Sequence, residues 1–277
     1  MVVINGRHLM YGLAGSGISL GFLWGILDGK KYASASWTTN SVPSIKWDSN
    51  WDRRESLNLG KSPQNREPGE DNQYNEQHGK AKPKASRHLI LIRHGQSTPV
   101  SKDCDTKLTE LGREQASITG KRLKDLNFPY TRIVQSSMQR ALETSQLIQI
   151  HIPGVKVETC ALLQEGAPIP PEPPIDHWKP KPENFYQDGA RIEAAFRKYF
   201  HRALPSQESD SYDVLVCHSN VIRYFLCRAL QFPPEAWLRF TLHNCSITWI
   251  VIRPNGRVIT YSIGDIGHIN SDKMSTS

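Results

Sequence analysis

Cysteine is scarce in this chain, and its spacing excludes two common kinds of site. Five cysteines occur among 277 residues, and no two of them form a C-x-x-C pair. Zinc and redox motifs usually contain such a pair, and a disulfide framework usually needs an even number of cysteines. We therefore expect no metal site, no disulfides and a reducing compartment. The cysteines are Cys104, Cys160, Cys217, Cys227 and Cys245.

The sequence also lacks basic runs interleaved with aromatic residues, which are typical of nucleic-acid-binding surfaces. Its charge is nevertheless positive, with 34 Lys and Arg against 27 Asp and Glu and a formal net charge of +7. A basic balance suits anionic partners. Because no nucleic-acid motif is present, we expect phosphorylated groups or acidic lipid rather than nucleic acid.

Long uncharged runs are absent except near the amino terminus, where Leu9–Leu27 carries no formal charge. As a helix this run would span about 28 Å at ~1.5 Å per residue, enough to cross the hydrocarbon core of a bilayer. The alternative is a secretory signal peptide, because Ala33-Ser34-Ala35 resembles the cleavage site of such a peptide. The length of the run favours an uncleaved transmembrane helix, and we assign residues 1–33 to this membrane anchor.

Aliphatic residues are few between residues 34 and 86, a polar segment dotted with proline and glycine. Such a composition cannot bury enough apolar surface to fold alone, so we predict a tether. It contains one unusual element, WDSNWD, at residues 47–52. Its two tryptophans, and likewise its two aspartates, are four residues apart, so each pair would share a helical face. Such aromatic anchors typically dock onto another surface; the alternative is a hydrophobic spot on the tether.

From residue 87 to residue 277 short strand patterns alternate with helical ones. HLILI, RIV and DVLVC are typical of buried strands, while SITWIVI and RVITYSI flank an Asn255-Gly256 turn and predict a β-hairpin. The sequence therefore predicts one α/β domain with three layers, α/β/α. Its sheet would be mainly parallel, with an antiparallel C-terminal edge hairpin.

Helical patterns occupy the stretches between these strands. We expect helices over Leu111–Leu126, over QRALETSQLI with Ser136 or Ser137 as the N-cap, over residues 187–204, and over NVIRYFLCRAL. A proline-rich stretch at residues 167–182 is expected to be irregular.

Three groups of polar residues directly follow predicted strands. Arg93 and His94 follow HLILI, Arg140 lies in the first helical turn after RIV, and His218 follows DVLVC. Ligand sites in α/β sheets lie at the carboxyl ends of strands, so we expect these side chains to meet at one edge. A neutral imidazole is a good nucleophile toward phosphorus, and arginine binds phosphoryl oxygens in a bidentate manner. Each residue alone could be ordinary, but the set predicts phosphoryl-transfer chemistry.

A second spacing offers a competing nucleophile. Cys217 and Arg223 have the C-x5-R spacing of cysteine-dependent phosphatases, in which a loop wraps the phosphate. The intervening residues include Val221 and Ile222 and no glycine, which fits the start of a helix better. A cysteine at the end of an apolar strand is usually a buried, inert thiol, so a histidine nucleophile is favoured.

The motifs LIRHGQS, LTELGREQA, SSMQRALET and HSNVIR occur in this order, and together they resemble the histidine phosphatase superfamily, also called the phosphoglycerate mutase-like family. The resemblance covers about residues 88–265 and implies the phosphoglycerate mutase-like fold and an enzyme without cofactor or metal. Within the superfamily the chain is similar to mitochondrial serine/threonine protein phosphatases through WDSNWDRRE, LLQEGAPI, DGARIEAAFR and VIRPNGRV.

The resemblance implies a role for each site residue. His94 matches the histidine that becomes phosphorylated, with Arg93 beside it. Arg140 and His218 match the other phosphate-binding positions, and Glu165 in LLQEG matches the general acid. A carboxyl group after a predicted strand could protonate a leaving alkoxide and then activate water. The alternative for Glu165 is a solvated loop carboxylate.

Two departures from the mutase pattern bear on the substrate. Val100 stands where mutases carry asparagine, and GAPIPPEPP follows Glu165 where they carry an R-x-Y-G stretch. Features that hold a small phosphoglycerate are thus missing, which favours hydrolysis and a more open site for a protein phosphoester. The resemblance implies phosphoserine and phosphothreonine as substrates, with phosphohistidine as an alternative. The alternatives are a small-molecule phosphatase or mutase, and a membrane scaffold with a phosphatase-like domain.

The resemblance also bears on the tether. In relatives a W-D-P-N-W-D motif drives assembly into higher oligomers and activates the phosphatase; here Ser49 replaces the proline. We expect a homo-oligomer in which this arm packs in trans on a neighbouring catalytic domain. The residues assigned to assembly are Trp47, Asp48, Asn50, Trp51 and Asp52.

Two further expectations rest on the resemblance. Residues 65–71 lie where relatives carry an acidic docking motif for a Kelch-type adaptor, but Pro68 replaces its serine, so we expect no such interaction. The chain is expected to be a single-pass protein of a mitochondrial membrane, with the outer membrane favoured.

Overall fold

The computed structural model describes residues 46–54, 82–98, 105–176 and 178–276. The chain divides into two units, residues 1–48 and residues 49–277. Within the described residues, no helix is both long enough and apolar enough to cross a membrane. The predicted anchor at Leu9–Leu27 and the acidic stretch at residues 65–71 lie outside them, so both stay predictions.

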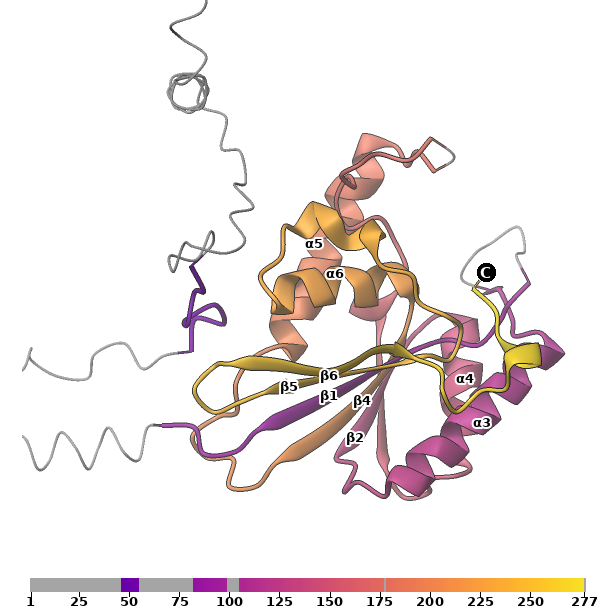
Figure 1. Cartoon of the computed structure of the whole chain (residues 1–277), viewed down its shortest axis with the longest axis horizontal. Coiled ribbons are helices and arrows are strands. Elements are labelled where there is room, and N and C mark those ends of the chain that lie inside the picture. Colours follow the sequence, from indigo (N-terminus) through magenta and orange to yellow (C-terminus); the bar gives the residue numbers. More distant parts are fainter. Residues whose placement is uncertain (1–45, 55–81, 99–104, 177, 277) are drawn as a thin grey trace, which may run out of the picture. The chain divides into compact units, whose positions relative to one another are not determined.

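One six-stranded sheet forms the centre of the second unit (Figure 1). The strands are β1 (Arg87–Arg93), β2 (Arg132–Ser136), β3 (Lys156–Cys160), β4 (Ser211–Cys217), β5 (Ile247–Ile252) and β6 (Val258–Asp265). Their order is β3-β2-β4-β1-β5-β6. The first four are parallel, whereas β5 pairs antiparallel with β1 and β6 pairs antiparallel with β5. The predicted parallel sheet with an antiparallel edge hairpin is confirmed.

Helices connect the strands. They are α3 (Glu110–Leu126), α4 (Gln139–Gln149), α5 (Pro182–Tyr199) and α6 (Ser219–Ala229), with short 3-10 helices η3 (Ala161–Leu163), η4 (Pro234–Arg239) and η5 (Ser271–Lys273). Only α5 departs clearly from its predicted bounds. It begins earlier because Pro182 suits the first helical position. It ends at Tyr199, where the C-cap Phe200 is already extended and its N–H donates to the Phe196 carbonyl at 2.8 Å.

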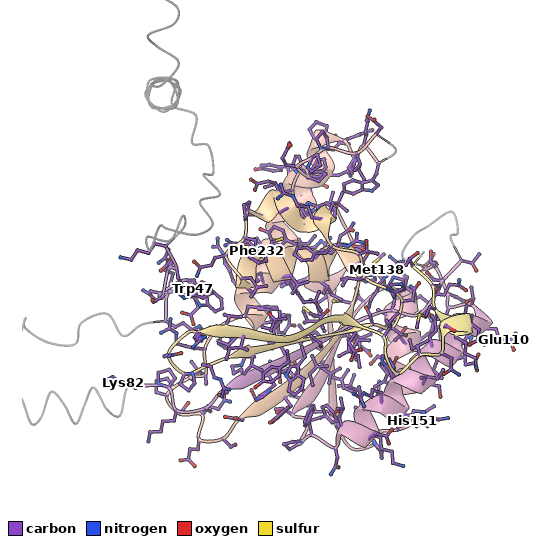
Figure 2. The ribbon with its side chains drawn as sticks, in the orientation of Figure 1. Trp47, Lys82, Glu110, Met138, His151 and Phe232 are labelled. Carbon is purple, nitrogen blue, oxygen red and sulfur yellow. The ribbon has the colours of Figure 1, made fainter. Side chains whose placement is uncertain are left out.

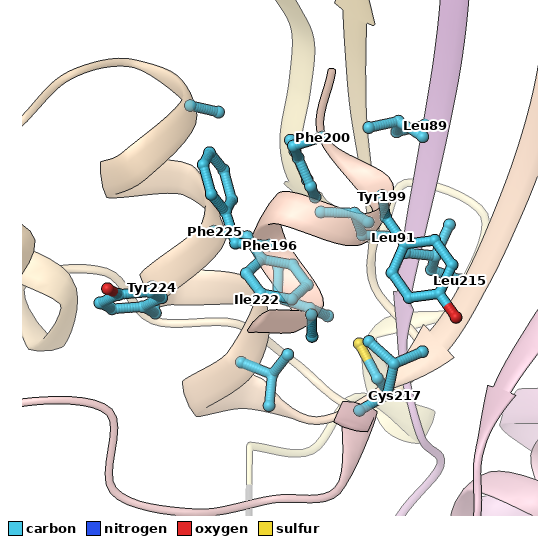
Figure 3. Close-up of a cluster of buried hydrophobic side chains, with 14 of the residues drawn as sticks. Leu89, Leu91, Phe196, Tyr199, Phe200, Leu215, Cys217, Ile222, Tyr224 and Phe225 are labelled. Carbon is cyan, nitrogen blue, oxygen red and sulfur yellow. The ribbon is translucent and has the colours of Figure 1, made fainter. Parts of the chain in front are cut away.

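The helices cover both faces of the sheet (Figure 1). Side chains alternate along β1, so Leu89 and Leu91 face one side while Ile90 and Ile92 face the other. Both sides carry a buried cluster, which explains why this strand is buried throughout and why its centre, LILI, is apolar without alternation. Figure 3 shows the cluster that α5 and α6 cover. Its members include Leu89, Leu91, Phe196, Tyr199, Leu215 and Phe225.

The predicted N-cap of α4 is wrong. Met138, which is labelled in Figure 2, holds that position without a side-chain cap hydrogen bond. Ser136 ends β2, and its hydroxyl lies 2.8 Å from Nε2 of His218. The side chain expected to cap a helix therefore contacts a predicted site residue.

The hairpin between β5 and β6 turns as predicted. Gly256 has a φ of +81°, in the left-handed region that favours glycine, and its N–H donates to the Arg253 carbonyl at 2.9 Å. Ile252 at the end of β5 pairs with Arg87 at the start of β1. The turn therefore lies at the amino ends of the parallel strands, the edge opposite to His94.

Candidate active site

The carboxyl ends of β1, β2 and β4 meet at one edge of the sheet. The register pairs Arg93 of β1 with Cys217 of β4, and β2 lies on the other side of β4. His94 and His218 therefore leave neighbouring strands at the same level. Their ring centroids are 5.1 Å apart. Sheet topology alone thus brings together two histidines that are far apart in the sequence.

The buried imidazole of His94 is held by a partner on each nitrogen. Nδ1 lies 2.7 Å from the Gly95 carbonyl oxygen, and Nε2 lies 3.1 Å from Nε of Arg140. A carbonyl oxygen only accepts and a guanidinium only donates, so these partners assign the proton to Nδ1. The lone pair then resides on Nε2. A nucleophilic nitrogen consequently faces a cation that binds phosphoryl oxygens well.

Arg140 occupies the first turn of α4 and is 4% exposed. A cation is disfavoured at this end of a helix, because the macrodipole and the free backbone N–H groups are positive there. An anion bound beside Arg140 would interact favourably with the guanidinium and the helix terminus together. The position is therefore suited to an anionic ligand.

His218 is the N-cap of α6 and is fully buried. Its Nε2 contacts the Ser136 hydroxyl, while its Nδ1 has no hydrogen-bond partner within the part of the chain that the structure describes. A buried polar atom without a partner costs free energy. A ligand oxygen in the site would satisfy it.

Both histidines are kept neutral. Burial lowers the pKa of His94 well below its ordinary value of 6.5, and the charges of Arg140 and Arg93 lower it further. Burial also lowers the pKa of His218, with His94 and Arg140 contributing. An imidazole that stays neutral retains the lone pair a nucleophile needs. The cations of the site therefore favour the reactive form of His94.

Arg93 lies at the end of β1 and is anchored by backbone oxygens. Its Nη1 donates to the Leu242 carbonyl at 2.6 Å and to the Thr276 carbonyl at 2.7 Å. Burial lowers its pKa to about 10, although the negative charge of Glu165 raises it. The guanidinium thus stays charged at neutral pH. Its Nε is buried with no hydrogen-bond partner among the described residues, which leaves a donor for a ligand.

Glu165 lies in the loop after η3. Its carboxylate accepts hydrogen bonds from the Gly166 N–H at 3.1 Å, the Asn220 N–H at 3.3 Å and the Ser219 hydroxyl at 3.4 Å. The residue as a whole is partly exposed, but the carboxylate lies among protein atoms, and this burial raises its pKa. A carboxyl group with a raised pKa holds its proton longer as pH rises, which suits a general acid.

The competing cysteine is not placed for catalysis. Residues 219–229 form α6, so no phosphate-wrapping loop follows Cys217. Its side chain belongs to the buried cluster under α5 and α6, as Figure 3 shows. Burial raises the pKa of this thiol well above its ordinary range. A neutral, enclosed thiol is a poor nucleophile.

Two site contacts were not predicted from the sequence. Asn244 donates from its side-chain amide to the His94 carbonyl at 3.1 Å, and the Thr144 hydroxyl accepts from the Gly95 N–H at 3.1 Å. Asn244 belongs to none of the quoted motifs, and Thr144 ends the SSMQRALET motif without a role assigned to it. Both fix the backbone around the nucleophile, and only the folded arrangement identifies them.

The WDSNWD arm is divided between the two units. In the second unit it forms a turn, in which the Arg53 N–H donates to the Asn50 carbonyl at 2.9 Å. Residues 49–52 lie in this turn and not in a helix, and Arg53, which follows them, has a φ of +52°. The helical conformation predicted for this segment is therefore wrong. Residues 1–48 hold Trp47 and Asp48, and residues 49–277 hold Asn50, Trp51 and Asp52.

Trp51 and Asp52 dock onto the α/β domain within the second unit. Nε1 of Trp51 donates to the Gly256 carbonyl at 2.8 Å, and its ring centroid lies 6.0 Å from that of Phe196. The Asp52 carboxylate accepts hydrogen bonds from Arg202, from N at 2.8 Å, Nε at 3.0 Å and Nη2 at 2.8 Å. Burial raises the pKa of Asp52, but the hydrogen bonds and charge of Arg202 outweigh this and lower it overall. The arm thus has a specific docking site.

A cavity of about 500 Å³ lies at the amino ends of the strands, lined by residues that include Arg87, Arg132 and Asp213. Its two arginines already share Asp213 at 3.0 and 2.9 Å. No residue predicted to be catalytic lines it. Within the described ranges, no cluster of His, Cys, Asp or Glu could hold a metal ion, and metal-free chemistry stays a prediction.

Comparisons with known proteins support the motif assignment. Residues 89–167 and 171–262 match the family described as the Histidine phosphatase superfamily (branch 1). The mitochondrial serine/threonine-protein phosphatase PGAM5 of Mus musculus is 53% identical over 245 residues, which cover 87% of this chain and 84% of the relative. The mitochondrial serine/threonine-protein phosphatase Pgam5 of Drosophila ananassae is 48% identical over 260 residues, covering 92% and 90%.

Solved structures agree on the fold. The structure named mycobacterial hydrolase 2 aligns with a TM-score of 0.51 and 20% identity, covering 68% of this chain and 95% of its own. The alpha-ribazole phosphatase from Shigella flexneri aligns with a TM-score of 0.50 and 21% identity, covering 64% and 96%. At such identity these similarities concern the fold alone.

Proposed function

This chain belongs to the histidine phosphatase superfamily and is a phosphatase, and from that premise we propose that it is a mitochondrial serine/threonine protein phosphatase acting through a phosphohistidine on His94. The observation that carries the proposal is the state of His94. Its Nδ1 is committed to the Gly95 carbonyl, and its Nε2 lone pair faces Arg140.

In the first step Nε2 of His94 attacks phosphorus. The N–P bond forms as the ester P–O bond breaks, and the proton of the Glu165 carboxyl passes to the leaving alkoxide. Arg93 and Arg140 stabilise the charge that spreads over the phosphoryl oxygens. With the Ser136 hydroxyl donating to Nε2 of His218, Nδ1 of His218 becomes a donor for one of these oxygens.

In the second step water hydrolyses the phosphohistidine. Glu165, now a carboxylate, takes a proton from water as the water oxygen attacks phosphorus. The N–P bond breaks, its electron pair returns to Nε2 of His94, and inorganic phosphate leaves. Glu165 is then protonated again and ready for the next substrate.

The choice of protein phosphoesters rests on two observations. The relatives that share about half of this sequence are named serine/threonine-protein phosphatases. The sequence also lacks the R-x-Y-G stretch and the asparagine that accompany phosphoglycerate binding in mutases, since GAPIPPEPP and Val100 occupy those places. Phosphoserine and phosphothreonine proteins are therefore the proposed substrates.

Assembly and anchoring complete the proposal. Trp51 and Asp52 bind a defined surface, and a chain as long as residues 55–81 can span up to roughly 90 Å when extended. That reach allows the arm to dock in trans on a second copy, giving a homo-oligomer with raised activity. Residues 9–27 would anchor the protein in a mitochondrial membrane, with the outer membrane favoured.

The test is to trap the intermediate. The full chain in detergent is mixed with a phosphoserine peptide carrying labelled phosphate and quenched in alkali, in which phosphohistidine survives. We expect label that acid releases, its loss in His94→Ala, and its retention in Cys217→Ser, with both variants folded by circular dichroism. Near-wild-type turnover in His94→Ala would exclude the mechanism. Faster turnover of phosphoglycerate than of the peptide would exclude the substrate class.

A further inference from the structure

Helix α5 carries two charged side chains that contact the chain segment around Glu165, the proposed general acid. The guanidinium of Arg191 donates to three carbonyls of that loop, those of Leu162 at 3.0 Å, Gln164 at 2.6 Å and Glu165 at 3.0 Å. Its Nη2 also contacts Asp188 at 2.8 Å. One side chain thus binds the backbone on both sides of the Glu165 Cα atom.

Asp188 completes the contact from the preceding turn of the helix. Its Oδ1 accepts from Arg191, and its Oδ2 accepts from the Ala167 N–H at 3.0 Å. Residues 162–167 are therefore bound to α5 before and after Glu165. We call Asp188 and Arg191 the α5 clamp.

The fit between the clamp and the loop leaves no room for a side chain at residue 166. A Cβ atom on Gly166 would lie 2.4 Å from Cγ of Asp188 and 2.6 Å from Nη2 of Arg191. A Cβ atom on Gly189 would lie 2.5 Å from the Pro168 carbonyl oxygen. Helix and loop are packed in direct contact here, so a displaced loop would also lose this packing.

The clamp is too enclosed to be an ordinary surface ion pair. The side chains of Arg191 and Asp188 are 20% and 28% exposed, and most of their hydrogen bonds go to backbone atoms of the loop. By contrast, the contacts that hold the Glu165 carboxylate itself measure 3.1 to 3.4 Å. The position of this carboxylate therefore depends mainly on where the clamp holds its backbone.

We propose that Arg191 and Asp188 are positioning residues for Glu165. They hold the carboxyl group where its proton can reach the leaving alkoxide and where the carboxylate can later take a proton from water. Neither residue touches the substrate. The proposal rests on the acid–base role proposed for Glu165, and it gives a function to the DGARIE stretch, which contains both residues.

The leaving group distinguishes positioning from a purely structural role. Nitrophenolate is a stable anion and needs no proton to leave, whereas the alkoxide of serine does. Damage to the general acid therefore slows phosphoserine cleavage selectively, while general misfolding slows both substrates alike. The parameter to compare is kcat/KM, because it reports the steps up to formation of the phosphohistidine.

The experiment uses the full chain and the variant Arg191→Gln. General acid–base catalysis contributes about 10²- to 10⁴-fold, and partial misplacement should forfeit about 10- to 100-fold of this on a phosphoserine peptide. On 4-nitrophenyl phosphate the loss should stay below about threefold, since that step needs no acid. The matched control is Arg197→Gln on the same helix, because Arg197 is exposed and pairs with Glu193 away from the loop.

Two further variants keep the outcomes distinct. Glu165→Gln alone tests the acid: equal losses on both substrates would refute the proposed function of Glu165, whatever Arg191 does. If Glu165→Gln is selective, adding Arg191→Gln should cost little more, because the acid is already absent. Equal losses on both substrates in Arg191→Gln, or full additivity, would overturn the positioning role. Asp188→Asn keeps the side-chain shape and should also lose more kcat/KM on the phosphoserine peptide than on 4-nitrophenyl phosphate. If Arg191→Gln does not fold, this variant tests the positioning role in its place.

Discussion

The buried pair of Asp52 and Arg202 gives the sharpest test of the arm. Their side chains are 0% and 5% exposed, and among the described residues the carboxylate accepts its hydrogen bonds from Arg202 and from the Arg54 N–H. Replacing Asp52 by alanine removes these bonds and takes the buried carboxylate away from the enclosed guanidinium of Arg202. We expect the arm to leave its docking site in this variant.

The magnitude follows from the burial of the pair. Breaking a buried ion pair by removing one partner costs about 3 to 5 kcal/mol. The neighbouring residues Arg53 and Arg54 are exposed, so solvent screens the site in part, and we take the lower end, about 3 kcal/mol. Since every 1.4 kcal/mol is tenfold, the docking equilibrium should weaken by roughly 150-fold.

The assay is sedimentation velocity of the full chain in detergent, paired with turnover of a phosphoserine peptide. Wild type should sediment as an oligomer, and Asp52→Ala should shift toward smaller species with reduced turnover. The Asp52 pKa is lowered by Arg202, so docking should hold at neutral pH. It should be lost only as pH falls below about 4 and the carboxylate becomes protonated.

The matched control is Asp176→Ala, which removes an exposed aspartate paired with Lys179. This variant should sediment and turn over like wild type. Unchanged sedimentation and unchanged turnover in Asp52→Ala would refute the reasoning. A drop in activity without loss of the oligomer would show that docking acts within one chain.

Three other predictions concern the site and the arm. Glu165→Gln should reduce kcat/KM on a phosphoserine peptide by about 10²- to 10⁴-fold. In wild type, kcat/KM should fall as pH rises through the raised pKa of Glu165, because the acid loses its proton, and this fall should be absent from Glu165→Gln; an unchanged pH profile contradicts this. Cys217→Ser should retain kcat/KM, because the thiol faces the core; a loss of more than tenfold with the fold intact argues for the cysteine. Trp51→Phe keeps a ring but loses the hydrogen bond to Gly256, so it should weaken docking by only about 1 kcal/mol in sedimentation, and a loss as large as that of Asp52→Ala would contradict the view that the ion pair dominates.

Much of the fold could be predicted because local pattern and tertiary environment agree. β1 and β4 contain the apolar runs LILI and VLVC since both faces of the sheet are covered, and the shortness and β-branched residues of these runs exclude buried helices. The turn at Gly256 was predictable because its conformation requires glycine. The start of α4 was not predictable from its capping residues, because the hydroxyl of Ser136 contacts His218 instead of capping the helix.

The site was predictable only as far as topology determines it. Strand ends place His94 and His218 at one edge whatever their side chains do, so pattern alone could pair them. The hydrogen bond from Asn244 and the clamp of Arg191 depend on chain segments that approach only in the folded domain. No spacing in the sequence encodes such contacts.

The arm illustrates a different limit. Its composition indicated a docking element, but the partner could not be read from WDSNWD itself. Arg202 lies just beyond the end of α5 and Gly256 lies in a hairpin turn, and neither carries a motif that announces a binding site. The docked turn also depends on the positive φ of Arg53, which residue preferences do not predict.

Helix α5 connects the loop that carries Glu165 with the docking site of the arm. Asp188 and Arg191 hold the acid loop, while Phe196 contacts Trp51, and Arg202 follows the same helix. If docking of the arm raises the affinity of the site for a phosphate-like ligand, thermodynamic reciprocity requires that this ligand raises the affinity of docking by the same factor. A phosphate-like inhibitor bound at His94 would then promote assembly, so occupancy of the enzyme by its own substrates would feed back on the size of its oligomer.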